Sequence, residues 1–372
     1  MSPEIMFSKP TTPFPSEEYA KRIERLSKTV ARNKLDALFV LTDLNRLYLT
    51  GFAASNGILV LEPGEEPVFY TDFRYLEMAR TQIGFARIAK LTDLKKIFGP
   101  LAKRRKWRKA GYEGSLACAR MTALKETMPT VEEWVDAEKH IIDLRAIKSP
   151  REQAALRCAV HTGDIVFENL LEEIEPGMTE WEIRGLLREL TDAFSQGEAF
   201  DCIIAVGANA SKCHHHPSLR PLKPGQELLV DMGVRVEGYL SDMTRTVFYG
   251  KPSRKLGGIY KTVLEANRKA IHAIRAGKTC GEIDAVARKI IGKSGHARHF
   301  GHGLGHGVGL EVHEQPRLAA KNTTVLKPGM VLTVEPGIYI PGVGGVRIED
   351  MIIVRPNGCE VLTTTAKELL VL

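Results

Sequence analysis

Three patterns are missing from this chain of 372 residues, and each absence excludes a class of protein. No apolar run approaches the roughly 18–20 residues that a membrane-spanning helix needs, so we expect no membrane segment. The opening stretch, MSPEIMFSKPTTPFPSEEYA, has no apolar core of the signal-peptide type, which predicts a cytoplasmic protein. The six cysteines are scattered without a C-x-x-C pair. That spacing argues against a disulfide scaffold and a thiolate zinc site, and it fits a reducing compartment.

An excess of one charge sign is present but small, and part of it is local. Lys and Arg number 52 against 45 Asp and Glu, a net charge of +7. The stretch AKRRKWRKA at 102–110 places six basic residues around Trp107. A basic run beside an aromatic residue can bind nucleic acid, but a solvated helix face or loop is the commoner explanation. Because no nucleic-acid-binding motif accompanies the run, we expect no nucleic-acid partner.

Length and composition predict two globular domains. Domains usually contain roughly 100–200 residues, and 44% hydrophobic with 26% charged residues is ordinary globular composition. Residues 17–145 alternate helical and strand-like segments: a helix in SEEYAKRIERLSKTVARNKL, a buried strand in DALFVLT and a hairpin in GILVLEPGEEPVFYT. This order predicts a small α/β domain.

A strong helix start marks the domain boundary. In AIKSPREQAALRCA, Ser149 is a predicted N-cap, Pro150 occupies the first helical position and Glu152 completes a capping box. We therefore expect one domain over 1–147 and a second over 148–372.

The second domain contains an internal repeat. LKPGQELLVDMG at 222–233 recurs as LKPGMVLTVEPG at 326–337, so that Asp231 corresponds to Glu335. EPGMTEWEI at 175–183 likewise recurs as RAGKTCGEI at 275–283, each copy with a Gly stop and a Thr-x-x-Glu capping box. A period of about 100 residues is far above the 20–50 of solenoid repeats. The repeat predicts one domain of two similar halves, each helix–helix–sheet.

Each half also carries a hairpin with two acidic residues. If the first turn centres on the Val-Glu of VEGY, Asp231 and Asp242 are directly opposed, with Cβ atoms about 4.5–5.5 Å apart. In the second copy, TVEPGIYIPGVGGVRIED, Glu335 and Glu349 each lie seven positions from Gly342. Four carboxylates brought together repel and raise one another's pKa values unless cations lie among them. Ordinary solvated strand-end acids are the alternative, but two matched hairpins favour metal binding.

A nitrogen ligand is expected in FGHGLGHGVGLEVHE at 300–314, where His302, His306 and His313 stand among five glycines. The glycines permit close backbone approach, as a tight site requires. The segment matches neither the H-E-x-x-H zinc motif nor a phosphate-binding loop. Carboxylates with one imidazole suit Mn²⁺, Co²⁺ or Fe²⁺, with Zn²⁺ also compatible. Enough carboxylates are present for two ions about 3.5–4 Å apart, as in two-metal hydrolases.

Several motifs of the chain together resemble those of a known family. DMG…SDMTRT, GHGVGLEVHE, TVEPGIY and VRIED, together with LYLTGF at 47–52 and TDFRY at 71–75, resemble the pita-bread metallopeptidases of the aminopeptidase P and prolidase branch. The resemblance covers essentially the whole chain. It implies an α/β (α+β) protein with a small creatinase-like N-terminal domain and a pseudo-two-fold pita-bread catalytic domain. It also implies two divalent ions, Mn²⁺ first, at Asp231, Asp242, His306, Glu335 and Glu349.

Further residues take substrate-side positions by the same resemblance. His214, 17 residues before Asp231, and His313 correspond to substrate-contacting histidines, and Cys213 stands where the family often has Pro. His215 and its neighbour His216 are expected to be bystanders. Two more residues, His302 and Arg347, are expected near the ligands. His302 is expected either beside a ligand or in direct contact with metal or substrate, and Arg347 is expected to pair with a ligand carboxylate.

The implied activity is hydrolysis of Xaa-Pro bonds at peptide N-termini or in dipeptides, by a homodimer acting on peptides through a metal-bridging hydroxide. Glu335 is expected to accept the proton of the attacking water and pass it to the leaving amine. Alternatives are a peptidase of the same fold without proline specificity, a creatinase-like hydrolase of small C–N compounds, and a non-catalytic binding module. Whether only dipeptides or also longer peptides are cleaved stays open.

Overall fold

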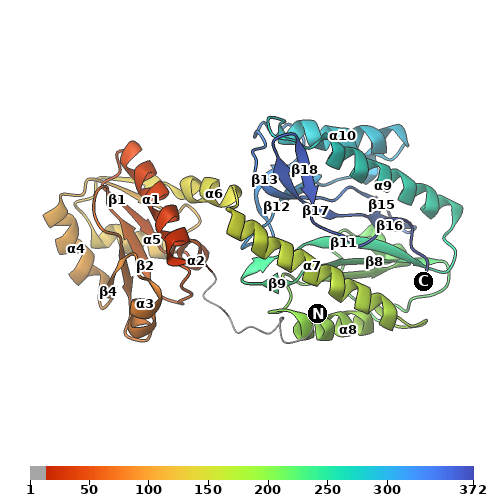
Figure 1. The fold of residues 1–372 in the computed structure, drawn as a ribbon, viewed down its shortest axis with the longest axis horizontal. Helices are drawn as coiled ribbons and strands as arrows, with labels where there is room; N and C mark the ends of the chain where they lie inside the picture. The colour runs from red at the N-terminus through yellow and green to blue at the C-terminus, as the bar shows by residue number, and fades with distance from the viewer. Residues whose placement is uncertain (1–13) are drawn as a thin grey trace. The chain divides into compact units, whose positions relative to one another are not determined.

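The computed structural model describes residues 14–372, which form two compact units that meet in sequence between Arg145 and Ala146 (Figure 1). Within that range no helix combines the length and the apolar character needed to cross a bilayer. The elements of the N-terminal unit are α1 (Ser16–Arg32), β1 (Ala37–Val40), α2 (Asp43–Thr50), β2 (Ile58–Leu61), β3 (Val68–Thr71), α3 (Leu76–Gln82), β4 (Arg87–Lys90), α4 (Leu94–Arg105), β5 (Lys109–Tyr112), α5 (Cys118–Thr127), β6 (Glu133–Asp136) and α6 (Glu138–Ala146).

The N-terminal unit is built on a six-stranded mixed sheet in the order β4-β3-β2-β1-β5-β6. The predicted helix at α1, the buried strand β1 and the antiparallel β2–β3 hairpin are confirmed. The apolar side chains of α4 and α5 pack on one face of the sheet, against residues such as Phe39 and Val60. The alternation of strand residues toward opposite faces explains this single-sided cluster.

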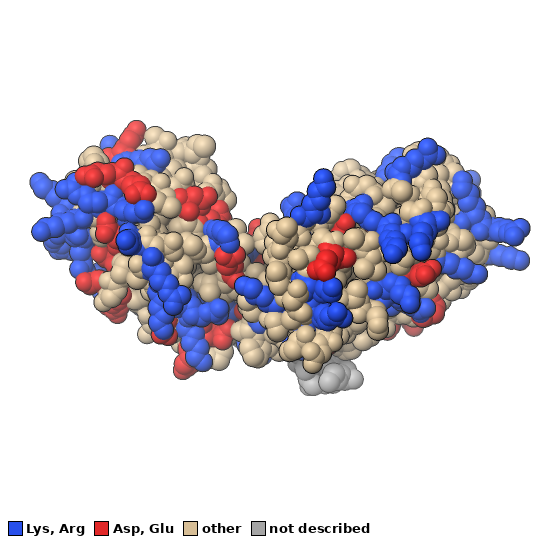
Figure 2. All heavy atoms as spheres, turned by 90° about the horizontal axis from the view of Figure 1, so that it is seen from above, with Lys and Arg blue, Asp and Glu red and all other residues tan. Residues whose placement is uncertain are grey.

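The basic run at 102–110 ends α4 and begins β5. Trp107 is buried, and its Nε1 donates to Glu62 Oε2 at 2.9 Å. Arg105 pairs with Glu65, and Arg108 pairs with Glu132. Figure 2 shows basic side chains gathered over the end of the unit that carries α4. The aromatic residue of the run is therefore a core residue and is not available for stacking on a base.

The second unit consists of two halves, each of which begins with two helices and continues in β-strands. Its first half contains α7 (Pro150–Glu173), α8 (Glu180–Phe194), β7 (Ile203–Val206), the 3-10 helix η2 (Gly207–Ser211), β8 (Gln226–Met232), β9 (Arg235–Val236), β10 (Tyr239–Leu240) and β11 (Met243–Tyr249). Its second half contains α9 (Arg254–Ala273), α10 (Cys280–Lys293), η3 (Ala297–His299), β12 (Gly305–Gly307), β13 (Glu314–Leu318), β14 (Val331–Val334), β15 (Gly337–Ile340), β16 (Gly344–Arg347), β17 (Asp350–Arg355) and β18 (Gly358–Val361).

The repeat predicted from the sequence is confirmed in local detail. The capping boxes of Thr179 and Thr279 are both formed, as is that of Ser149 at the start of α7. Each of the two threonines also makes an isolated antiparallel bridge to the residue just before the LKPG segment of its own half, Thr179 to Pro221 and Thr279 to Val325. The two phrases recur in the sequence because they contact each other in each half.

Two helical layers cover the two sheets of this unit (Figure 1). One sheet has the order β11-β8-β7 and packs through its apolar side chains against α7 and α8. The other has the order β13-β12-β14-β17-β18 and packs against α9 and α10. Polar strand residues on the inner side of these sheets are therefore free to build a site between the halves.

The register of the first hairpin corrects the sequence prediction. Thr244, and not Asp242, lies opposite Asp231 in the β8–β11 ladder. The turn centres one residue later than expected, because Glu237 and Gly238 adopt positive φ values of 50° and 79°. Two consecutive positive-φ residues make the tight turn that suits the twist of a hairpin. A register change of two keeps each side chain on its face, so the two aspartates still face the same side.

The second hairpin has the predicted register. Val334 opposes Asp350 in the β14–β17 ladder, and Gly337 opposes Arg347 in the β15–β16 ladder. Both pairings continue the register in which positions 335 and 349 face each other. The first hairpin thus places its acids diagonally and the second places them opposite each other.

Candidate metal centre

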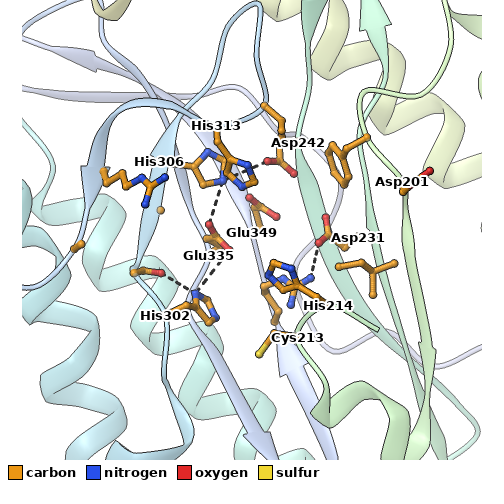
Figure 3. A pocket seen from close by; sticks show the side chains of 18 residues that line it. Asp201, Cys213, His214, Asp231, Asp242, His302, His306, His313, Glu335 and Glu349 are labelled. Atoms are coloured by element: carbon orange, nitrogen blue, oxygen red, sulfur yellow. Dashed lines mark hydrogen bonds and ion pairs between the residues drawn. The ribbon is translucent and has the colours of Figure 1, made fainter. Parts of the chain in front are cut away.

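The five side chains predicted as metal ligands line one cavity of about 480 Å³ (Figure 3). Each stands at or beside the end of an inner strand: Asp231 on β8, Asp242 before β11, His306 on β12, Glu335 after β14 and Glu349 before β17. Strand ends from both halves thus meet at the cavity.

Three of these residues form a compact ligand group. One ligand atom from each of Asp242, His306 and Glu349 lies within 4.8 Å of the others. His306 Nε2 is 3.6 Å from Asp242 Oδ2 and 3.3 Å from Glu335 Oε1. The same imidazole nitrogen therefore faces carboxylates from both halves.

Two glycines make the position of His306 sterically accessible. A Cβ atom at Gly305 would lie 2.1 Å from the Thr333 carbonyl oxygen, and one at Gly307 would lie 2.5 Å from the Gln315 carbonyl oxygen. Only glycine permits such close backbone approach on both sides of the β12 strand. The expectation that this glycine-rich segment brings backbones together is confirmed at these two positions.

Arg347 fixes the orientation of Asp231. Its Nη2 donates to Asp231 Oδ2 at 2.5 Å, and its Nε donates to Thr244 Oγ1 at 2.9 Å. Thr244 Oγ1 in turn donates to Glu349 Oε2 at 2.7 Å. Asp231 Oδ1, although buried, has no hydrogen-bond partner among residues 14–372. A buried carboxylate oxygen without a donor is costly unless a cation contacts it.

The electrostatics of the acids point the same way. Burial raises the pKa of Asp242 and of Glu349 well above their ordinary values, and the neighbouring carboxylates raise them further. Burial also raises the pKa of Asp231, against the opposing effect of Arg347. Burial raises the pKa of Glu335 as well, but the hydrogen bond and charge of His306 outweigh it, and the net pKa is lowered. The raised pKa values of three carboxyl groups, together with the unsatisfied oxygen of Asp231 described above, fit a site for divalent cations.

His302 is held by a hydrogen-bond chain that begins at Arg347. Arg347 Nη1 donates to the Tyr339 hydroxyl at 3.0 Å, and that hydroxyl is 2.9 Å from His302 Nε2. His302 Nδ1 donates to the Gly303 carbonyl at 2.8 Å, so in the neutral ring Nε2 accepts from the Tyr339 hydroxyl. Burial lowers the pKa of His302, in agreement with a neutral ring. His302 Nδ1 is 4.0 Å from Glu335 Oε2, beside that carboxylate.

The two predicted substrate-side histidines also line the cavity. The ring of His313 lies 4.3 Å from that of His306, edge to face. Burial and the neighbouring His306 lower the pKa of His313. His214 is exposed at the cavity wall, next to the half-buried Cys213, whose thiol pKa is raised by burial.

Several residues of the site were missed by the sequence analysis. Arg317 lines the cavity and opposes His306 in the β12–β13 ladder. In the sequence, only its position in the HEQPR segment close to His313 could have indicated a role at the site. His215 does not line the cavity, as expected of a bystander to the substrate, but its Nε2 lies 2.8 Å from Glu180 Oε2, a contact the sequence did not indicate. Tyr339 stands in the TVEPGIY motif, but nothing in that motif indicates which side chain its hydroxyl contacts.

Comparisons with known proteins agree with this geometry. Residues 154–356 match the family model described as Metallopeptidase family M24, and residues 22–147 match the one described as Creatinase/Prolidase N-terminal domain. An Xaa-Pro dipeptidase of Pyrococcus furiosus is 35% identical, over 94% of this chain and 99% of that protein. The solved structure of an Xaa-Pro dipeptidase from Bacillus anthracis has a TM-score of 0.91 and 36% identity, covering 95% of this chain and 100% of that one. A prolidase from Pyrococcus horikoshii OT3 has a TM-score of 0.89 and 34% identity, over 94% and 100% of the two chains.

The matches confirm a creatinase-like N-terminal domain followed by a pita-bread catalytic domain. They also imply divalent metal ions, which the carboxylate-rich cavity fits. The catalytic family model spans more than half of this chain, and full-length relatives are identical to this chain at about a third of their residues. This chain therefore belongs to metallopeptidase family M24.

Proposed function

We propose that this M24 peptidase is an Xaa-Pro dipeptidase that cleaves the bond before proline in dipeptides. The single observation that carries the proposal is the convergence of Asp242, His306 and Glu349 within 4.8 Å, in a cavity that Asp231 and Glu335 also line. Full-length relatives named Xaa-Pro dipeptidase support the choice of substrate.

Two divalent ions would be held by Asp231, Asp242, His306, Glu335 and Glu349. An oxygen-rich set with one imidazole suits Mn²⁺ first, and Co²⁺, Fe²⁺ or Zn²⁺ next. When bound, the ions supply Lewis acidity at the scissile carbonyl and lower the pKa of water. Asp231 Oδ1, which has no hydrogen-bond partner in the part of the chain that the structure describes, would then gain a cationic one.

The protein's own residues would handle the protons and the substrate. Glu335 accepts the proton of the attacking water and returns it to the proline nitrogen as the bond breaks. His313 and His214, both on the cavity wall, donate hydrogen bonds to the carbonyl oxygen as negative charge develops there. His302 and Arg347 hold Glu335 and Asp231 in place. The tertiary amide before proline has no N–H, so the site needs no acceptor for one.

Arg317 favours a dipeptide over a longer substrate. Its side chain is exposed at the cavity and forms no ion pair with any of residues 14–372. A guanidinium forms two parallel hydrogen bonds with a carboxylate, and a dipeptide ends in a free carboxylate on its proline. A longer peptide carries an amide there, which a guanidinium binds more weakly.

We further propose a cytoplasmic homodimer with domains over 1–147 and 148–372. All six cysteines are free thiols, which supports a reducing compartment. The homodimer is proposed from the family resemblance, since isolated exposed apolar side chains such as Phe73 and Leu219 are common on protein surfaces. Sedimentation of the purified protein tests the dimer.

The deciding experiment compares Ala-Pro with Ala-Pro-Ala-Ala and Ala-Ala as substrates of protein reconstituted with Mn²⁺. We expect turnover of Ala-Pro that is strongly reduced by Asp231→Asn and by Glu335→Gln, with metal content also reduced. The matched control is Asp192→Asn, an exposed acid of α8. Faster cleavage of the tetrapeptide would identify an aminopeptidase instead. If Ala-Ala were cleaved as fast as Ala-Pro, the peptidase would have no specificity for proline. If the protein bound metal but cleaved none of the peptides, it would be a non-catalytic binding module.

A further inference from the structure

A buried carboxylate outside the metal centre binds the loop that carries His214. Glu180, the first residue of α8, has no exposed surface. Its Oε1 accepts hydrogen bonds from the Val206 backbone N–H at 2.7 Å and from Asn209 Nδ2 at 2.9 Å. Its Oε2 accepts from the Ser218 backbone N–H at 2.9 Å and from Ser218 Oγ at 2.5 Å. His215 Nε2 donates to the same oxygen at 2.8 Å.

These donors lie on both sides of His214 in the sequence. Val206 and Asn209 precede it, and His215 and Ser218 follow it, so Glu180 ties both ends of the loop to one point. The loop between them contributes Cys213 and His214 to the cavity wall (Figure 3). An ionised, fully desolvated carboxylate holds its donors firmly because water cannot replace them.

The second half has a comparable device. Asp284 on α10 is buried, and its Oδ1 accepts from the Leu304 backbone N–H at 3.1 Å. Arg288 Nε donates to Asp284 Oδ2 at 2.6 Å, and its Nη2 donates to the His302 carbonyl oxygen at 2.5 Å. In each half, therefore, an acid on the second helix anchors a loop that presents a histidine to the cavity. In the second half the basic side chain that contacts the acid is Arg288. In the first half it is His215, which contacts Glu180.

We propose that His215, bound to Glu180, is a positioning residue that keeps His214 directed at the substrate carbonyl. It is the only one of the Glu180 donors adjacent in sequence to His214, and its side chain is 9% exposed. The other donors hold the loop where it leaves β7 and where it turns back toward β8. Without the His215 contact, the segment at 213–216 keeps its ends but loses its central attachment.

The inference rests on the proposed function in one respect, the role of His214 at the substrate carbonyl. Its test uses the neighbouring histidines, since removing Glu180 would orphan five donors at once and disturb folding. His215→Ala removes the contact, His215→Gln keeps an N–H donor that can reach Glu180, and the exposed His216→Ala is the matched control. All are compared in the full-length, metal-reconstituted enzyme on Ala-Pro.

We expect His215→Ala to lower kcat roughly ten- to a hundredfold, as small misplacements of a catalytic group do. KM should stay within about twofold, because the contact matters for the transition state. His215→Gln should recover most of the loss, and His216→Ala should match the wild type. In a His214→Ala background, His215→Ala should cause no further loss, because it acts through His214.

Equal losses from His215→Ala in both backgrounds would overturn the proposal, as would a full loss in His215→Gln. Hydrogen exchange supplies a readout that does not depend on turnover. The amides of 212–216 should exchange faster in His215→Ala and unchanged in His216→Ala; identical protection in both would also overturn the proposal. A wild-type enzyme inactive on Ala-Pro would refute the proposed function, while the exchange result would still decide the positioning role.

Discussion

Arg347 and Asp231 form a one-sided pair: Arg347 Nη2 donates to Asp231 Oδ2 at 2.5 Å, while Asp231 Oδ1 is buried and has no hydrogen-bond partner within the described range 14–372. The pair therefore orients the Asp231 carboxylate so that Oδ2 is hydrogen-bonded and Oδ1 remains available to a cation. The same guanidinium reaches Thr244 and the Tyr339 hydroxyl, through which it supports Glu349 and His302. One buried cation thus orients residues from both hairpins.

Arg347→Lys tests whether this geometry matters beyond the charge. A lysine keeps the positive charge but cannot contact Asp231, Thr244 and Tyr339 at once, because it lacks the planar fork. We expect activity or metal affinity to fall about ten- to a hundredfold, the usual effect of losing a partner of a metal ligand. Steady-state kinetics and metal titration measure it, with exposed Arg188→Lys as control. Unchanged values would show that charge alone suffices.

Removing the metal should make stability depend on pH in a defined direction. In the metal-free protein the pKa values of Asp242 and Glu349 lie well above their unfolded values. Stability is therefore greatest in acid and falls as pH rises through the raised values, because the folded state must give up protons it binds tightly. Reloading Mn²⁺ should raise Tm more at pH 8 than at pH 5.5, and thermal unfolding after EDTA treatment measures this. A larger increase in Tm on Mn²⁺ addition at pH 5.5 than at pH 8 would contradict this prediction.

Glu227 is a second, metal-independent source of pH dependence. It is buried on β8, its Oε1 has no partner among residues 14–372, and burial raises its pKa from 4.5 to about 7. Between these values the unfolded chain has lost the proton and the folded protein has kept it, so stability falls as pH rises. The loss is about 3 kcal/mol.

Glu227→Gln should remove this component. At pH 8 the variant should be more stable than the wild type by up to about 3 kcal/mol, and near pH 4.5 the difference should largely vanish. Urea unfolding at both pH values measures it. Glu168→Gln, at an exposed position of α7, should change neither value. If the wild type and Glu227→Gln lose stability in parallel, Glu227 is not the group responsible.

Arg317→Ala should separate dipeptides from longer peptides. Loss of a charge-assisted contact to a carboxylate should raise KM for Ala-Pro roughly tenfold or more. The rate on Ala-Pro-Ala-Ala, which has no carboxylate on its proline, should change little. The ratio of kcat/KM for the two substrates measures the effect. An equal loss on both would assign Arg317 to the general shape of the site.

Local patterns predicted from the sequence were accurate where a short segment determines its own structure. The capping boxes at Thr179 and Thr279 and the register around Gly342 depend on residues within a single turn or hairpin. The first hairpin was misplaced because Glu237, an uncommon residue at positive φ, occupies its turn. The prediction of a shared face survived because the error was an even number of residues.

Among contacts between distant segments, the pairing of Arg347 with a ligand carboxylate was predicted, and Asp231, 116 positions away, is its partner. The contact of His215 with Glu180, 35 positions away, and that of Tyr339 with His302, 37 positions away, were not predicted. No local pattern selects such partners, since packing of separate elements brings them together. The resemblance supplied the candidate ligand positions, but the anchoring contacts of His215 and Tyr339 required the three-dimensional structure.

The division of the candidate ligands between the halves links metal binding to the packing of the two halves. Asp231 and Asp242 come from the first half, whereas His306, Glu335 and Glu349 come from the second. Neither half carries all five side chains, so a cation bound by the full set would also cross-link the two halves.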